Sequence, residues 1–371
     1  MRARLADIAK AVPSDWKQPI PHQDSRLHQL APYIGKLKPV IARWLLQRFT
    51  VPGENVLDCF SGSGTIPLEA LLLGRRVMAF DTNPYAVVLT RAKLEAPSTL
   101  EAAQRQLAQR LLGAQARQPY AHDVPEWVKK FFHPNTLQEA LKFADECIER
   151  DDPFLLACLL SILHHQRPGF LSYPSSHLVP YLRDRKFPRS QYPELYKERA
   201  IEPRLAAKLQ RTYKYCRPMD RTGVLKVGRV GVAELSLERE VNAIITSPPY
   251  MNALDYIRDN RLRLWFLDRS TTDYSPEPTE KQDQFDSIIA AFARNALVHL
   301  RRGGYCILIV GETVLRKRIT SHPADRILSK LMLEHPSLIL EEVIQDEIPD
   351  IRRSRRTATA TKQELILVLK K

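Results

Sequence analysis

The sequence contains few cysteines and no long apolar run. Its five cysteines lie far apart and form no CxxC pair: Cys59, Cys147, Cys158, Cys216 and Cys306. This spacing provides neither a zinc-ligand pattern nor the disulfide framework of a small secreted protein. No run of about 18 or more apolar residues is present, so we expect no membrane helix. The first residues, Met1 to Leu5, lack the apolar core of a signal peptide, and we expect a cytoplasmic protein.

Acidic residues are in the minority, with 42 Asp and Glu against 56 Lys and Arg, a formal net charge of +14. Such a balance favours a polyanionic partner through counterion release, although a basic protein without one remains the alternative. The excess is concentrated at 183–229, which has fourteen Lys or Arg and five Asp or Glu. Aromatic residues are interleaved there, so this stretch suits phosphate contacts and base stacking; the alternative is a solvated helical face.

The first third of the chain predicts alternating strands and helices. A short apolar run at 56–60 is followed by a glycine loop at 61–65 and a helix at 67–73. A second strand at 76–80 ends on Asp81, and a helix begins at Asn83. This order is typical of a βαβα unit of a parallel sheet.

The strand signals then stop and resume late in the chain. Residues 99–165 have a helical pattern, and 166–222 are rich in Pro, Arg and Tyr and show no clear one. Strands are predicted at 227–232, 241–246, 305–310, 338–344 and 365–369, and helices at 253–268, 284–300 and 322–334. We therefore expect an α/β fold whose sheet domain comprises 1–96 and 226–371. A largely helical insertion, 97–225, would interrupt it.

The glycine loop and the acidic residue after it indicate a nucleoside site. Gly62 and Gly64 allow the backbone to approach a ligand closely. Asp81, at the end of the next strand, can accept hydrogen bonds from two ribose hydroxyls. No Lys follows the loop as a P-loop requires. A plain structural turn is the alternative.

The whole segment, Asp58-Cys59-Phe60-Ser61-Gly62-Ser63-Gly64-Thr65, resembles the cofactor motif of the amino-methylating DNA methyltransferases, D-x-F-x-G-x-G-T. The resemblance implies a Rossmann-like class I methyltransferase with a mostly parallel, doubly wound sheet, which binds S-adenosyl-L-methionine. It implies cofactor-binding roles for Asp58, Phe60, Gly62, Gly64, Thr65 and Asp81. The segment around Tyr33 and Lys36 resembles the part that lines the methionine end.

A second motif follows the strand predicted at 241–246. Ser247-Pro248-Pro249-Tyr250 has two prolines that lack a backbone N–H and stiffen the exit from the strand. The serine hydroxyl can bond an N–H group without adding charge, and Tyr250 offers a flat face on which a base can stack. These groups suit methyl transfer to an exocyclic amino group, which needs acceptors and positioning more than acid–base chemistry. A plain Pro-Pro turn is the alternative.

This segment resembles the catalytic motif of the same family, which implies catalytic roles for Ser247, Pro248, Pro249 and Tyr250. The serine version is typical of enzymes that act on cytosine N4, whereas adenine-N6 enzymes usually carry Asp or Asn there. A cytosine-C5 enzyme needs a Cys after a Pro, and this sequence has none. Family members often hold the cofactor adenine with an Asp where this chain has Val232; backbone contact near Ala233 is the expected replacement.

The insertion holds the candidate target-reading residues Arg183, Arg185, Lys186 and Arg189, and Arg353 and Arg355 lie in a second basic run. We expect double-stranded DNA as partner and no metal, since the histidines at 164, 165 and 177 are more typical of a core or a surface. The resulting hypothesis is a site-specific cytosine-N4 DNA methyltransferase of a restriction–modification system. It leaves open a cognate restriction endonuclease and the oligomeric state. An adenine-N6 enzyme, an RNA base amino methyltransferase and a non-catalytic nucleic-acid-binding protein are the alternatives.

Overall fold

The structure is a computed structural model of the whole chain. It describes residues 5–13, 16, 24–120, 123–165, 169–174, 185–249, 256–270, 281–315, 318–319, 323–347 and 361–371. Side chains at 256–259, 281–282, 312–315, 318–319, 347 and 361–362 are outside the description. None of the described helices combines the length and apolarity that crossing a membrane requires.

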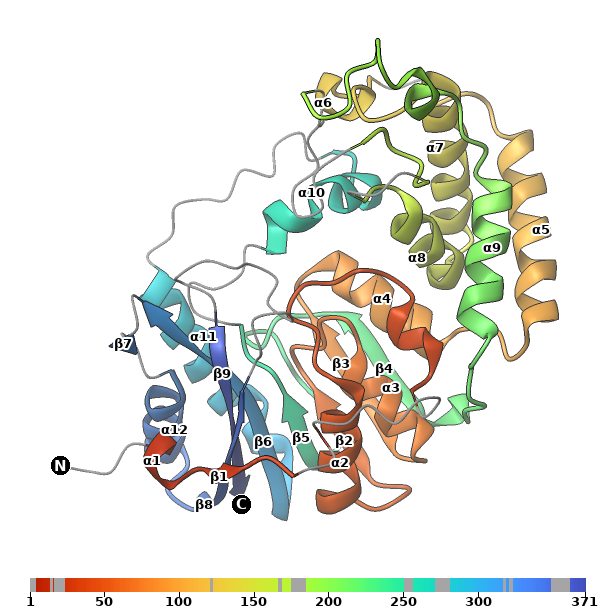
Figure 1. Ribbon diagram of the computed structural model, residues 1–371. Helices are drawn as coiled ribbons and strands as arrows, with labels where there is room; N and C mark the ends of the chain where they lie inside the picture. The colour runs from red at the N-terminus through yellow and green to blue at the C-terminus, as the bar shows by residue number, and fades with distance from the viewer. Residues whose placement is uncertain are drawn as a thin grey trace.

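The described strands form one sheet (Figure 1), whose order is β1-β8-β9-β6-β5-β2-β3-β4, with β7 paired to β6. β9 is antiparallel to both of its neighbours, and the pairs from β6 through β5, β2 and β3 to β4 are parallel. With β9 set aside, the order β4-β3-β2-β5-β6-β8 is the 3-2-1-4-5-6 order of a Rossmann sheet. The bounds are β1 Lys10–Ala11, β2 Asn55–Asp58, β3 Arg76–Asp81, β4 Val224–Arg229, β5 Val241–Thr246, β6 Leu300–Leu315, β7 Arg318–Ile319, β8 Ile339–Glu347 and β9 Thr361–Lys370.

The central strands are buried on both faces because helices cover each side. Neighbouring residues of one strand, such as Ile244 and Ile245 of β5, belong to two different apolar clusters. Helices α2 (Pro39–Phe49), α3 (Thr65–Leu72) and α4 (Pro84–Leu94) pack on one face. Helices α11 (Lys281–Asn295) and α12 (Pro323–Glu334) pack on the other. This arrangement explains the continuous apolar runs that predicted the strands.

The residues between α4 and β4 are largely helical (Figure 1). They form α5 (Leu100–Ala116), α6 (Glu126–Lys129), α7 (Pro134–Glu149), α8 (Pro153–Ile162) and α9 (Glu202–Tyr213), with 3-10 turns η3 (Pro193–Tyr196) and η4 (Arg221–Gly223). Every residue of α8 is buried, and this helix packs on α4, α7 and α9. Helix α10 (Tyr256–Leu267) contacts both α4 and α7. The insertion is thus fixed to the sheet domain by an apolar core that the two share.

The expected fold class, a Rossmann-like and mostly parallel sheet with helices on both faces, is confirmed by this topology. Several details differ from the sequence-based expectation, among them one strand and one helix. The strand predicted at 227–232 is Val224–Arg229, because the chain turns at Gly231, where the N–H of Glu234 donates to the Gly231 carbonyl. Helix α9 was not predicted; its apolar face is narrow, with Leu205 and Leu209 buried between charged neighbours.

Candidate active site

A cavity of about 720 Å³ opens at the carboxyl ends of β2, β3, β4 and β5. In open α/β sheets this edge is where ligands bind, and the volume is within the usual range for a ligand pocket, about 300–1,000 Å³. The lining includes Asp58, Phe60, Gly62, Thr65, Asp81, Ala233, Ser247 and Pro249, which the sequence singles out, together with Tyr33, Lys36, Glu234, Leu264, Ile288 and Ala291. Segments far apart in the chain therefore meet at one site.

Positive φ angles shape the glycine loop between β2 and α3. Gly62 has φ of 49° and Gly64 has φ of 71°, values that other residues rarely adopt. A Cβ on Gly64 would lie 2.9 Å from the Cα of Thr90 in α4, so the loop passes directly over that helix. The N–H of Gly64 donates to the carbonyl of Ser61 at 2.7 Å, which closes the turn. Gly64 supports the loop from behind and is absent from the cavity lining.

Asp81, the last residue of β3, fixes the loop from the side of the cavity. Its Oδ2 accepts from the N–H of Gly62 at 2.8 Å, and its Oδ1 accepts from the N–H of Asn83 at 2.9 Å. Burial raises the pKa of this carboxyl, and the backbone N–H donors partly oppose the rise. The carboxylate can accept further hydrogen bonds from a ligand, because each oxygen has two lone pairs.

Asp58, at the end of β2, is buried deeper. Its Oδ1 accepts from the Thr246 hydroxyl at 2.7 Å and from the N–H of Phe60 at 3.3 Å. Burial raises the pKa of Asp58 to about 7, with those two hydrogen bonds opposing the rise and the charge of Asp81 adding to it. A cationic group placed in the cavity would favour the ionised form. Thr246 therefore links the two motifs, since it ends β5 immediately before Ser247.

Ser247 and Pro249 line the cavity at the exit of β5, and Pro248 between them is buried. The Ser247 hydroxyl donates to the carbonyl oxygen of Ile309 on β6 at 3.0 Å. Because its one proton is used there, the lone pairs of the oxygen are left to accept from another group. Tyr250 lies outside the described residues, so its predicted stacking role stays a prediction.

The far end of the cavity is lined by the turn after β4. The side-chain amide of Asn295 in α11 donates to the carbonyls of Val232 and Ala233, at 2.9 and 2.8 Å. The backbone at Ala233, which lines the cavity, is therefore held in place by α11. Phe60, which packs on Phe292 at 6.2 Å between ring centroids, and Ile288 give this end an apolar surface.

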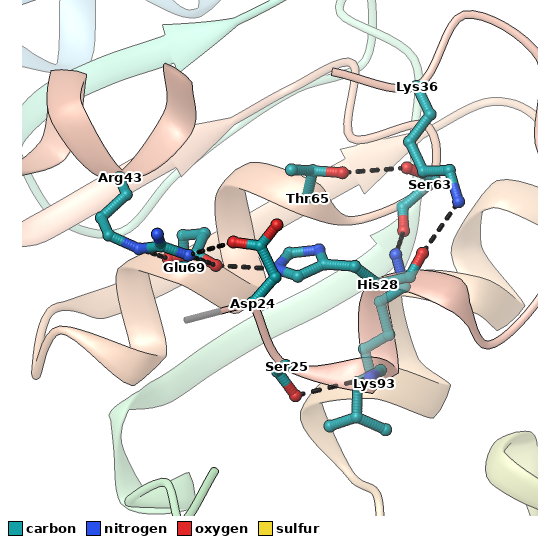
Figure 2. Close-up of polar contacts among 10 residues, drawn as sticks. Asp24, Ser25, His28, Lys36, Arg43, Ser63, Thr65, Glu69 and Lys93 are labelled. Atoms are coloured by element: carbon teal, nitrogen blue, oxygen red, sulfur yellow. Dashed lines mark hydrogen bonds and ion pairs between the residues drawn. The ribbon is translucent and has the colours of Figure 1, made fainter. Parts of the chain in front are cut away.

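The opposite end is closed by residues 24–43, which are tied to α3 through Glu69 (Figure 2). The fully buried Glu69 carboxylate accepts from His28 Nε2 at 2.7 Å and from Arg43 Nε at 2.9 Å. Arg43 also donates to Asp24 at 2.7 Å. Burial lowers the pKa of His28, and the hydrogen bond and charge of Glu69 oppose this shift. This network holds Tyr33 and Lys36, both in the cavity lining, against the glycine loop.

The predicted nucleic-acid residues that the structure describes are absent from the cavity lining. Arg185 and Lys186 are exposed. Arg189 lies over a pair of tyrosines whose ring centroids are 4.9 Å apart, with its guanidinium 5.1 Å from the Tyr173 centroid and 4.7 Å from that of Tyr196. The remaining candidates, Arg183, Arg353 and Arg355, lie outside the described residues. In the part of the chain that the structure describes, no cluster of His, Cys, Asp and Glu could hold a metal ion.

Four contributors to the site were not predicted from the sequence: Ile309, Asn295, Thr90 and Lys93. Ile309 acts through its backbone carbonyl, which leaves no trace in the residue type. Thr90 and Lys93 did leave a signal, because they are polar residues spaced i, i+3 on the buried face of α4.

The residues that line this cavity fit S-adenosyl-L-methionine. Asp81 would accept from the ribose hydroxyls, and Asp58 would face the ammonium of the amino-acid moiety. The apolar end formed by Phe60 and Ile288 would take the adenine ring, with backbone groups near Ala233 at its edge. Tyr33 and Lys36 would close the methionine end. Gly62 brings the loop backbone close to the chain that joins the two ends.

Comparisons with known proteins agree with this part of the site. Residues 29–91 match the family described as DNA methylase, of the N6/N4 type. The type II methyltransferase M.MjaII of Methanocaldococcus jannaschii is 29% identical over 69 residues, which are 19% of this chain and 13% of that protein.

Two solved structures are more distant. TrmN of Thermus thermophilus is 16% identical with a TM-score of 0.38, over 94% of this chain and 53% of that chain. The rRNA methyltransferase aviRa of Streptomyces viridochromogenes is 11% identical with a TM-score of 0.34, over 95% and 94%. The chain thus spans about half of TrmN and a small part of M.MjaII. TM-scores this low carry no conclusion, whereas the two sequence matches support the DNA amino-methyltransferase family for the segment that builds the glycine loop.

Proposed function

We propose that this chain is an S-adenosylmethionine-dependent DNA methyltransferase that modifies the N4 amino group of cytosine. The observation that carries the proposal is the hydrogen bond from the Ser247 hydroxyl to the Ile309 carbonyl. It makes Ser247 a hydrogen-bond acceptor toward the same cavity that Asp81 and Asp58 line.

An exocyclic amino nitrogen is a weak nucleophile because its lone pair is delocalised into the ring. The Ser247 oxygen would accept one N–H of this group, and a backbone carbonyl of the Ser247–Pro249 turn would accept the other. Two acceptors favour a tetrahedral nitrogen whose lone pair points at the methyl donor. When bound, S-adenosylmethionine supplies a methyl group on a sulfonium, which becomes a neutral thioether as the nitrogen gains the methyl and releases a proton. Thr246 would keep this turn in register with Asp58 during the reaction.

The serine version of the motif, which resembles that of cytosine-N4 enzymes, supports cytosine as the target. An Asp at position 247 would place a second acceptor next to the Ile309 carbonyl, which is unfavourable. Ser or Asn can donate to this carbonyl, so the contact disfavours Asp, one of the two residues that adenine-N6 enzymes usually carry there.

We further propose that the insertion, 97–225, reads the DNA target. The exposed Arg185 and Lys186 suit phosphate contacts, and the nearby Arg189 lies over the paired rings of Tyr173 and Tyr196. Cytosine would have to leave the base stack to reach Ser247, at a cost of a few kcal/mol.

The test is to incubate the protein and S-adenosylmethionine with duplex DNA, tRNA and rRNA separately, and to identify the methylated nucleosides by mass spectrometry. N4-methylcytosine in DNA supports the proposal. N6-methyladenine would show that the target base is adenine and not cytosine. Methylation of RNA alone would show that the substrate is RNA and not DNA. A protein that binds no cofactor would be non-catalytic.

A further inference from the structure

Lys93 is a buried lysine behind the glycine loop. It belongs to α4, is 1% exposed, and its ammonium donates to the carbonyl of Ser63 within the loop. Figure 2 shows the side chain reaching up from α4 toward Ser63. Burial lowers the pKa of Lys93 well below its usual range, and the charge of Lys36 lowers it further.

Lys36 approaches the same loop from the cavity side (Figure 2). Its ammonium donates to the carbonyl of His28 at 2.8 Å, and burial lowers its pKa to about 8, with a contribution from the charge of Lys208. Within the described residues neither lysine has a carboxylate partner. The nearby carboxylate, Glu69, is already bonded to His28 and Arg43. Two lysines therefore lie together at this end of the cavity, and neither bonds a carboxylate in the part of the chain that the structure describes.

Bringing two ammonium groups together in a buried site is costly unless an anion joins them. Ser63 and Lys36 line the cavity, and Lys93 lies one peptide group behind it. The cost is removed when a ligand places a negative charge at this end. The α-carboxylate of a bound amino-acid moiety has the right charge and size.

We propose that Lys93 is a positioning residue which, together with Lys36, makes ligand binding depend on the carboxylate of the cofactor. The inference rests on the proposed cofactor. Lys36 would contact the carboxylate directly. Lys93 would act through the Ser63 carbonyl, holding the loop open toward the ligand and adding its charge from behind.

The experiment compares two ligands by calorimetry: S-adenosylhomocysteine and its decarboxylated analogue, which keeps the amino group and lacks the carboxylate. Lys93→Met should weaken the binding of S-adenosylhomocysteine by about tenfold and change the affinity for the analogue by less than about twofold. Lys142→Met is the control, because Lys142 is a half-buried lysine that likewise donates to a backbone carbonyl, that of Gln115 at 3.1 Å. Neither residue lines the cavity, so this variant should change the binding of neither ligand.

The pH dependence of the unmodified protein gives a second measurement that needs no variant of Lys93. The titratable and charged groups around the pair are His28, Glu69, Arg43 and Lys208. As pH rises from 7 to 8.5, Lys36, whose pKa is about 8, loses its proton more readily than the ligand amines, so the preference for the carboxylate-bearing ligand should fall. Lys36→Met should remove most of this dependence of the ligand preference on pH.

The outcomes separate cleanly. An equal loss for both ligands in Lys93→Met would mean that Lys93 only shapes the loop, and would overturn the proposal. A preference that is flat with pH in the unmodified protein would overturn it as well. If the unmodified protein binds neither ligand, both the proposed cofactor and this inference are wrong. If it binds both ligands with equal affinity, the proposed function stands and this inference is wrong.

Discussion

The hydroxyl of Ser247 lies 3.0 Å from the carbonyl oxygen of Ile309, across the junction of two parallel strands, and donates its proton to it. The bond fixes the direction of the serine lone pairs before any substrate arrives. Such preorganisation is the main way in which an active site can favour charge that develops during a reaction.

Replacing Ser247 with Ala should lower kcat by about 10- to 100-fold, because one acceptor for the target amino group is lost. Affinity for S-adenosylhomocysteine should change by less than about twofold, since the adenosine and methionine contacts are elsewhere. Single-turnover methyl transfer and calorimetry measure the two quantities. Ser329→Ala is the control, because this serine bonds a carbonyl of its own helix, Asp325, far from the cavity. Equal activity of Ser247→Ala and the unmodified protein would refute the catalytic role.

Two further substitutions at Ser247 should differ from each other. Asn can donate its amide to Ile309 and accept with its oxygen, so Ser247→Asn should retain more activity than Ser247→Asp. The Asp variant sets two acceptors against each other and should lose nearly all activity without gaining activity on adenine. Labelled methyl transfer to DNA, followed by nucleoside analysis, compares them. An active Asp variant would show that the bond to Ile309 is dispensable.

Asp58 should make the cofactor-free protein less stable as pH rises. Its pKa in the folded protein, about 7, is above the ordinary value of 3.8, so the folded state holds a proton that the unfolded state releases. That contribution is present at low pH and is lost as pH rises from about 4 to about 7. The free energy of unfolding of Asp58→Asn, measured relative to that of the unmodified protein, should therefore increase by about 2 to 3 kcal/mol from pH 5 to pH 8. Urea unfolding at both pH values measures this gain, and a constant difference would contradict a raised pKa.

Gly64→Ala should destabilise the fold more than Gly53→Ala. Both glycines have positive φ, 71° and 85°, but an added Cβ meets nothing within 4 Å at Gly53 and meets Thr90 at 2.8 Å at Gly64. Backbone strain should cost about 1 to 2 kcal/mol at either site, and the clash should add about 1 to 3 kcal/mol at Gly64. Urea unfolding compares the free energies of unfolding. Equal losses would mean that the loop can move away from α4.

Removing a phosphate contact should reduce the salt dependence of DNA binding. Arg185→Ala should lower the slope of log affinity against log salt by about 1. Arg302→Ala is the matched control, because Arg302 is also exposed but lies near the amino end of β6, opposite the cavity. If the two variants have the same slope, the proposed DNA surface on the insertion is wrong.

The parts of the fold that depend on local pattern could be predicted from the sequence. The strand before Gly62 and the helix after it follow from a short apolar run, a glycine turn and a Pro in the first helical turn. Asp81 was placed at the end of the next strand for the same reason. Because parallel strands end at one edge of a sheet, the two motifs, each of which follows a strand, meet there.

The contacts between distant segments could not be predicted. The acceptor for Ser247 is a backbone carbonyl 62 positions away, and the carbonyl of Ala233 is held by Asn295 in a helix that has no motif. Lys93 lies on the apolar face of its helix, but its contact with the Ser63 carbonyl exists only once α4 is packed under the loop. Helix α9 was missed because its buried stripe is only Leu205, Leu209 and Thr212.

The central claim is that Ser247 presents an acceptor to the amino group of a cytosine in DNA. The most direct measurement is mass spectrometry of the nucleosides of duplex DNA incubated with S-adenosylmethionine and the unmodified protein or Ser247→Ala. The account predicts N4-methylcytosine with the unmodified protein and at least about tenfold less with the variant. Methylation at any other position, or N4-methylcytosine at equal yield from both proteins, would contradict it.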